Sequence, residues 1–154
     1  MRVLAIDTAL EACSAAVLDT ERGGILASES IPMLRGHAEA LLPLVSRVMS
    51  EAGLEFGVLD RIAVTVGPGS FTGLRVGVSA ARGIAVAAGK PAVGLTTLAA
   101  LAAPYIAVDD VTPLVAAIDA RNDQVYMQMF GAGGRSLIQP NTSSIRLRQR
   151  WLTT

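Results

Sequence analysis

Few side chains in this sequence have the chemistry of a catalytic or metal-binding group. The 154 residues include one histidine, His37, and one cysteine, Cys13. A zinc site needs three or four nitrogen, sulfur or oxygen ligands, which one histidine and one cysteine cannot supply in the usual combinations. A serine triad would have to use His37, and the GxSxG motif of a nucleophile elbow is absent. The sequence therefore predicts no metal site and no catalytic residue in this chain alone.

A glycine-rich run, GPGS at residues 67–70, is the strongest local signal. It lies between a β-branched segment at 61–66 and a helical segment that begins near Phe71, so its backbone amides and the helix dipole could bind an anion. The run is not a P-loop, because no glycine followed by lysine stands five residues after either glycine. It is not a dinucleotide fingerprint either, because Thr72 occupies the position of the third glycine. The alternative is a structural turn.

Two aspartates, Asp7 and Asp119, each follow an apolar run and precede a turn. The two carboxylates could together hold a magnesium–phosphate group between two lobes, since hard cations take carboxylate oxygens. The alternative is that each aspartate caps its own turn. This repeated order, a strand that ends in aspartate and then a hairpin, favours an internally duplicated, two-lobed fold. The candidate anion or nucleotide loop consists of Asp7, Gly67, Gly69 and Ser70.

Hydrophobic periodicity places these residues on an α/β framework. A mixed sheet of about five strands, the first three an antiparallel meander, is predicted from residues 3–7, 13–18, 25–31, 61–66 and 92–94. A later strand pair is expected at 114–119 and 124–130. After about residue 131 the pattern decays, so irregular or disordered structure is expected from there on. The chain is thus divided into a first lobe at 1–104 and the start of a second, truncated lobe at 105–154.

Two amphipathic helices are expected at 37–53 and 71–88, packed together, with Pro43 kinking or dividing the first. The second helix is apolar around so much of its girth that two of its sides must be buried. Glycines four residues apart on it would let another backbone come close, either that of the helix at 37–53 or that of a partner. The partner interface predicted on this basis consists of Leu41, Leu42, Val45, Met49, Gly73, Leu74, Gly77, Val78 and Arg82.

Composition narrows the classes of function. The chain is 51% hydrophobic and 17% charged with zero formal net charge, which is typical of a packed α/β protein and gives no broad electrostatic footprint for nucleic acid. Four arginines without an acid at 135–154 are either a solvated tail or a nucleic-acid contact. No uninterrupted run of about 20 apolar residues is available for a membrane span. A single cysteine and the lack of a signal-peptide pattern predict a cytoplasmic location.

The run GPGSFTGLRVG at residues 67–77 resembles the signature of the TsaB (YeaZ) family, and its GPG part also occurs in the paralogue TsaD. The runs LAIDTA at 4–9, HAE with LLP at 37–43, and IDAR at 118–121 fit the same family. The resemblance covers roughly residues 1–134. It implies an α/β fold with an actin-like (ASKHA, ribonuclease-H-like) lobe, in which helices flank a mixed sheet. It also implies a non-catalytic, accessory role beside TsaD in the synthesis of threonylcarbamoyladenosine (t6A) in bacterial tRNA.

Further expectations about ligands and partners come from this resemblance. A TsaD-like protein and a TsaE-like ATPase are the implied partners, a homodimer is the alternative, and tRNA is reached only through the complex. ATP and a metal are expected in the complex, with no cofactor held by this chain alone. TsaD holds its metal through an HxxxH pair, whereas here His37 stands at the first position and Leu41 at the second. Family members continue past residue 154, so the second lobe is expected to be incomplete.

Two other classes of function compete with this interpretation. One is an enzyme with the actin-like fold. The missing second histidine argues against a metallopeptidase, and the incomplete second lobe argues against a nucleotide-binding phosphotransferase. The other is a small Rossmann-like binding domain, which the antiparallel start of the sheet disfavours.

Overall fold

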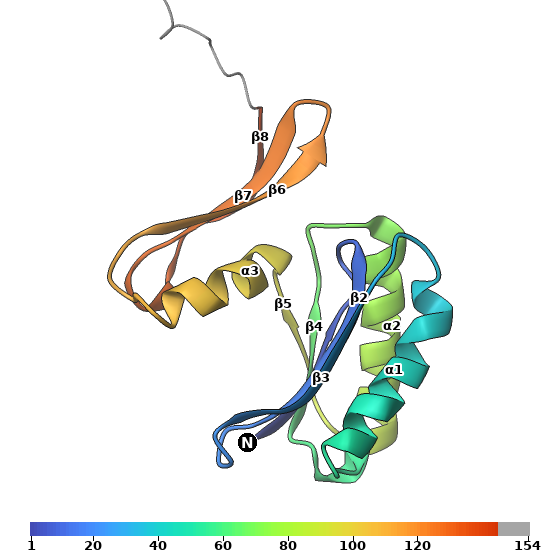
Figure 1. The fold of residues 1–154 in the computed structure, drawn as a ribbon. Coiled ribbons are helices and arrows are strands. Elements are labelled where there is room, and N and C mark those ends of the chain that lie inside the picture. Colours follow the sequence, from blue (N-terminus) through green and yellow to red (C-terminus); the bar gives the residue numbers. More distant parts are fainter. Residues whose placement is uncertain (145–154) are drawn as a thin grey trace, which may run out of the picture. The chain divides into compact units, whose positions relative to one another are not determined.

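Five strands form the sheet of the first part of the chain: β1 (Arg2–Asp7), β2 (Ala12–Asp19), β3 (Gly24–Pro32), β4 (Arg61–Thr65) and β5 (Ala92–Leu95). They belong to a computed structural model that describes residues 1–144 (Figure 1). The strand order is β3-β2-β1-β4-β5. The first three strands are antiparallel, whereas β4 lies parallel to β1 and β5 parallel to β4. The predicted mixed sheet with an antiparallel start is confirmed.

Two helices, α1 (His37–Glu51) and α2 (Phe71–Ala88), lie side by side on one face of this sheet (Figure 1). A short 3-10 helix, η1 (Phe56–Val58), leads from α1 to β4. Alternate strand residues enter the core because successive side chains of a strand point to opposite faces, and helical spacing brings one stripe of α1 onto them. The fully buried core side chains include Leu4, Val17, Leu41, Leu44, Val45, Val48, Leu59 and Ile62. The expected packing of the two helices together is confirmed.

Pro43 does not divide α1, which runs without interruption from His37 to Glu51. A proline inside a helix removes one backbone hydrogen bond, because its nitrogen carries no hydrogen. Pro43 lies on the exposed side of α1, where water can satisfy the carbonyl that loses its donor. Of the two alternatives expected at Pro43, a kink or a division, the division is therefore wrong.

The small residues of α2 face β1. A side-chain carbon added at Gly73 would collide with the carbonyl oxygen of Thr8, and one added at Gly77 would collide with the Thr8 hydroxyl. The Thr8 hydroxyl also donates a hydrogen bond to the carbonyl oxygen of Gly73, with 2.7 Å between the oxygens. The close approach that these glycines permit is therefore to the end of β1 in the same chain, and not to a second helix.

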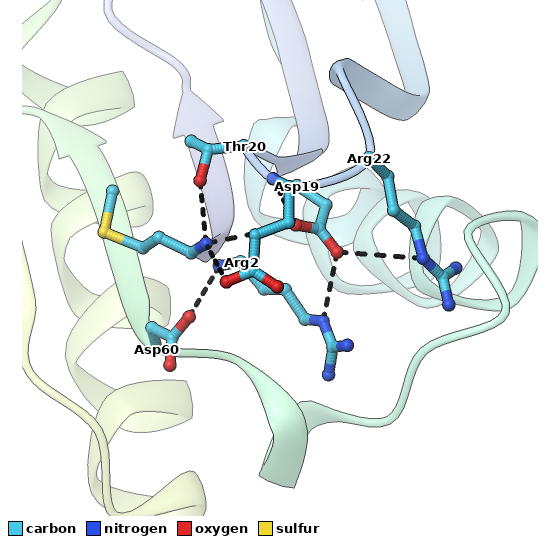
Figure 2. Close-up of polar contacts among 7 residues, drawn as sticks. Arg2, Asp19, Thr20, Arg22 and Asp60 are labelled. Atoms are coloured by element: carbon cyan, nitrogen blue, oxygen red, sulfur yellow. Dashed lines mark hydrogen bonds and ion pairs between the residues drawn. The ribbon is translucent and has the colours of Figure 1, made fainter.

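Asp19 is the centre of a polar cluster at the opposite end of β1, shown in Figure 2. Its carboxylate accepts hydrogen bonds from the Glu21 amide at 3.0 Å and from the Arg2 guanidinium at 3.2 Å. The Arg2 amide donates to Asp60 at 2.6 Å. These bonds join the start of β1 to the β2–β3 turn and to the segment before β4. Because Asp19 is 1% exposed, its charge depends on these partners.

The second part of the chain contains a helix, α3 (Thr97–Ile106), and the strands β6 (Leu114–Arg121), β7 (Gln124–Phe130) and β8 (Ser136–Ser144). Strand β8 is the last element within the described residues. The antiparallel order is β6-β7-β8, with a 3-10 helix, η2 (Ala132–Gly134), between β7 and β8. Two compact units result, with their boundary between Thr97 and Leu98, earlier than the predicted 104–105. The difference arises because Leu98 and Ala102 of α3 pack with Ala116 and Phe130 of this second sheet.

Strand β8 corrects the expectation of irregular structure from residue 131. It pairs with β7 from Phe130↔Ser136 to Gln124↔Ser144, with register shifts at Met127/Met129 and Met129/Phe130. Pro140 falls in the irregular part of the pairing, where a missing amide is tolerated. The strand is mostly polar, so hydrophobic alternation does not reveal it. Residues 145–154, to which the same expectation applied, lie outside the described residues.

Gly77→Ala should destabilise the protein, because the added methyl group would meet the Thr8 hydroxyl and the Val64 side chain. We expect a loss of about 1–3 kcal/mol in unfolding free energy, as for other overpacked cores. Gly83→Ala is the matched control on the same helix: its methyl group has open space, and the change should stabilise the helix by about 0.5–1 kcal/mol. Denaturant unfolding of both variants checks this. Equal effects of the two would contradict the described contact between α2 and β1.

Asp19 should make stability depend on acid pH. The Glu21 amide, chiefly, and then Arg2 hold the pKa of Asp19 below its ordinary value of 3.8. Such a group contributes stability that is fully present above the unfolded pKa and is lost as pH falls through the lower folded pKa. Asp19→Asn should therefore be less stable than wild type at neutral pH, with the difference shrinking below about pH 4. Thermal melts over this pH range test it, and parallel curves for the two proteins would refute it.

Candidate functional site

Asp7 ends β1 beside the end of β4, because parallel neighbours carry their C-terminal ends to the same edge. One oxygen of its carboxylate, Oδ1, accepts two hydrogen bonds: 2.7 Å from the Thr65 hydroxyl and 2.9 Å from the Ala9 amide. The bond from Ala9 is the turn-capping contact of an aspartate with the amide two residues on. Asp7 therefore fixes the β1–β2 turn and ties it to β4.

The loop at 67–70 is bound to the same turn. The Ser70 amide donates to the carbonyl oxygen of Ala9 at 2.7 Å, and a side chain at Gly69 would collide with that carbonyl. Ser70 is also the N-cap of α2, because its hydroxyl accepts from the Gly73 amide at 3.3 Å. The structure thus brings Asp7, Gly69 and Ser70 of the candidate loop together around Ala9. Gly67, buried, accepts from the Thr97 amide at 2.9 Å.

Three hydrogen-bond donors of this edge are already used within the chain. A phosphate needs free amides, hydroxyls or cations. Here the Ala9 amide is bonded to Asp7, the buried Thr8 hydroxyl to Gly73, and the Ser70 amide to Ala9. The turn at 8–11 contains no glycine and no cation, and its exposed Glu11 would repel a phosphate. In these contacts the glycine run acts as a turn that joins the start of α2 to the β1–β2 turn.

Asp119 has the same local role in the second unit. Its Oδ1 accepts from the Arg121 amide at 2.7 Å, at the end of β6. Arg121, Asn122 and Asp123 all have positive φ angles of 52–65°, and the turn they form is capped by this carboxylate. Asp7 and Asp119 are therefore matched in local structure, as the repeated order along the sequence predicted.

Neither His37 nor Cys13 belongs to a ligand cluster. No group of three or more histidine, cysteine, aspartate or glutamate side chains placed to hold a metal occurs within residues 1–144. His37 is 8% exposed, and its Nε2 has no hydrogen-bond partner in the part of the chain that the structure describes. Leu41, four residues later, is a core side chain. Cys13 is fully buried, and burial raises the pKa of its thiol.

A groove of about 860 Å³ runs between α1 and α2. Arg75 is its one charged lining residue, and its guanidinium lies over the ring of Phe71, 4.9 Å from the centroid. Leu42 is 57% exposed and Phe71 is 73% exposed, so apolar surface faces the solvent here. The groove is lined by Ala38, Leu41, Leu42, Phe71, Thr72, Arg75, Val76, Ser79, Ala80, Gly83, Ile84 and Ala87.

The residues predicted for a partner interface fall into three groups in the structure. Leu41 and Leu42 line the groove, and Arg82 is exposed on α2. Leu74 and Val78 are half-buried. The remaining four are packed inside the first unit, the side chains in its core and the glycines against β1: Val45, Met49, Gly73 and Gly77.

Sequence reasoning missed the groove-lining side of α2. Its residues recur at helical spacing, and Val76, Ala80, Gly83 and Ala87 lie along it. The available signal was a second stripe of small residues, offset from the stripe at Gly73 that packs on β1. Choosing between two stripes on one helix requires knowing which of them meets the sheet.

Comparisons with known proteins agree with the resemblance seen in the sequence. Residues 13–144 match the family model TsaD, described as tRNA N6-adenosine threonylcarbamoyltransferase. The chain is 33% identical to the tRNA threonylcarbamoyladenosine biosynthesis protein TsaB of Escherichia coli, over 99% of this chain and 70% of that protein. It is 37% identical to the protein of the same name from Haemophilus influenzae, over 82% of this chain and 52% of that one. The chain thus spans between half and seven tenths of these relatives.

Solved structures give the same result. YeaZ from Pseudomonas aeruginosa superposes with a TM-score of 0.79 at 35% identity, covering 93% of this chain and 66% of that one. The ROK hexokinase from Thermus thermophilus, at 24% identity and a TM-score of 0.56, shares the fold alone, which confirms the predicted actin-like lobe. Because a family model matches most of the chain, and the relatives at 33% and 37% identity are named TsaB, the chain belongs to the TsaB (YeaZ) family and is related through the same domain to TsaD.

Proposed function

We propose that this chain is a non-catalytic subunit of the cytoplasmic machinery that makes threonylcarbamoyladenosine in tRNA, and that it binds a TsaD-like protein through the groove between α1 and α2. The observation that carries the proposal is this apolar groove, in a chain whose Asp7 carboxylate is used in a structural turn. The names of the relatives in Escherichia coli and Haemophilus influenzae place those proteins in the same biosynthesis.

The groove has the composition of a helix-docking surface. Ala80, Gly83 and Ala87 line its α2 wall, and small side chains let the backbone of a partner helix come near. Leu42 and Phe71 supply exposed apolar area at its margins, and exposed apolar surface of this kind marks interaction sites. An interface of standard size would bury about 1,600 Å² in total, so it must extend beyond the groove over both helices.

The relationship with TsaD supports the choice of partner. The matched region, residues 13–144, contains both α1 and α2. A TsaD-like protein would therefore present an equivalent helix pair, and two such pairs can pack around a pseudo-two-fold axis. A homodimer would use the same surface with a true two-fold axis. The two assemblies would then exclude each other.

In this proposal, the metal, the nucleotide and the tRNA are handled by other members of the complex. Its single histidine is buried without a ligand cluster in the described residues, which argues against a metallopeptidase. Its β1–β2 turn does not fit phosphates, which argues against a phosphotransferase. A metal, ATP, a TsaE-like ATPase and the tRNA would therefore be engaged by, or through, the partner. Within residues 1–144 no helix is long and apolar enough to span a membrane.

Gly83→Leu should abolish the complex with the TsaD-family protein of the same organism while leaving the chain folded. The new side chain would enter the groove, where nothing lies within 4 Å of the added carbon, and leucine is a better helix former than glycine. Gly57→Leu is the matched control, an identical change at an exposed glycine with open space on η1. Sedimentation of the mixed proteins measures association, and circular dichroism checks folding. Normal association of folded Gly83→Leu would place the interface elsewhere.

ATP with magnesium should not bind to the isolated chain. Two donors at the β1–β2 turn, the Thr8 hydroxyl and the Ala9 amide, are already bonded, and Glu11 adds a repulsive charge. Isothermal titration calorimetry at millimolar nucleotide is the measurement. A stoichiometric binding isotherm that is weakened by Asp7→Ala would contradict the assignment of this edge as a structural turn.

A further inference from the structure

The charges around α2 are of one sign. Residues 62–108 contain three basic side chains, Arg75, Arg82 and Lys90, and no acid. The chain as a whole has no net charge, so this segment is a local excess of positive charge in a neutral protein. All three side chains lie on or directly after α2, the helix that forms one wall of the groove.

Arg75 and Arg82 lie on the solvent-facing side of α2. Both are exposed, as is Ser79 between them. Arg75 lies at the groove, over Phe71. Arg82 and Lys90 line a smaller hollow of about 420 Å³ near the end of the helix. The two arginines are seven residues apart, which is two turns, or about 10 Å along the axis.

The described part of the chain provides no acid for these cations. Its ion pairs involve Arg2, Arg22, Arg47 and the terminal amino group, and none involves Arg75, Arg82 or Lys90. Arg47 of α1 shows the contrasting case, because its guanidinium makes two bonds of 2.6 and 2.9 Å to Glu29 of β3. Arg75, Arg82 and Lys90 thus have no ion-pair partner in the described residues, and Arg75 lies at the edge of an otherwise apolar groove.

We propose that the occupant of the groove is a helix pair that carries carboxylates opposite Arg75 and Arg82, so that charge selects the partner and apolar contact holds it. This inference rests on the proposed function and specifies the chemistry of the partner. A helix with two acids seven residues apart would place both opposite the arginines. Partially desolvated pairs of this kind affect the association rate and the choice of partner more than the final affinity.

A protein partner fits this surface better than an RNA. A phosphate-binding surface uses many cations and few apolar side chains, whereas Arg75 is the single charged residue in the groove lining. Phe71, the one exposed aromatic ring of the groove, is already covered on one side by Arg75, which leaves less of it for stacking on a base.

The test compares the association of wild type, Arg75→Glu/Arg82→Glu and Arg75→Lys/Arg82→Lys with the TsaD-family protein of the same organism. Association rate and Kd are measured by surface plasmon resonance at about 0.05 M and about 0.5 M salt. Arg135→Glu/Arg121→Glu is the matched control, because both arginines are exposed in the second unit and the change in net charge is equal. Circular dichroism and binding of the bulk tRNA of the organism are recorded for each variant.

We expect the double glutamate variant to bind about tenfold or more weakly at low salt, mainly through slower association, and its salt dependence to be lost or reversed. The lysine variant and the control should keep the salt dependence of the wild type. Equal binding by folded wild type and glutamate variant overturns this inference and leaves the proposed function standing. If the wild-type chain forms no complex with the TsaD-family protein, both this inference and the proposed function are overturned. If the isolated wild-type chain binds tRNA and the glutamate variant does not, the cations serve RNA binding and the inference is overturned.

Discussion

The contact between α2 and the end of β1 is the constraint on which the first unit depends. Gly73 and Gly77 bring the helix backbone against Thr8, and the Thr8 hydroxyl bonds to the Gly73 carbonyl at that point. This contact fixes the distance between α2 and the sheet and the rotation of α2 about its own axis. The rotation in turn decides which stripe of small residues is buried and which one, around Gly83, lines the groove with α1.

A second set of contacts lies beside this one, at the edge of the sheet where β1 and β4 end. Asp7, Thr65, Ala9 and Ser70 use one another's donors and acceptors, so the edge is a junction between loops. A fold does not determine a function, and the surface proposed for partner binding lies on the two helices and not at this edge. The groove is apolar with a basic margin, which suits recognition of a related protein better than chemistry on a small molecule.

Much of the fold could be predicted from the sequence, because strands with β-branched runs and helices with a clear period carry their own signal. The mixed sheet, its antiparallel start and the two packed helices are of this kind. Strand β8 could not be predicted, since its pairing with β7 uses backbone groups and its polar residues show no alternation. Burial was only partly predictable for the residues assigned to a partner interface. Val45 and Met49 are apolar, but their place in the core follows from the rotation of α1, which periodicity alone does not give.

The boundary between Thr97 and Leu98 has a consequence for how the protein is made. All five strands of the first sheet, and both helices on it, come from residues 2–95. Every strand pairing of this unit is therefore complete before any of β6, β7 or β8 has been synthesised. Domains that fold during synthesis do so from the N-terminus onward, and this chain is arranged for that order. A ribosome that has released the first 97 residues from its tunnel has already delivered both walls of the groove, so this surface can form on a nascent chain.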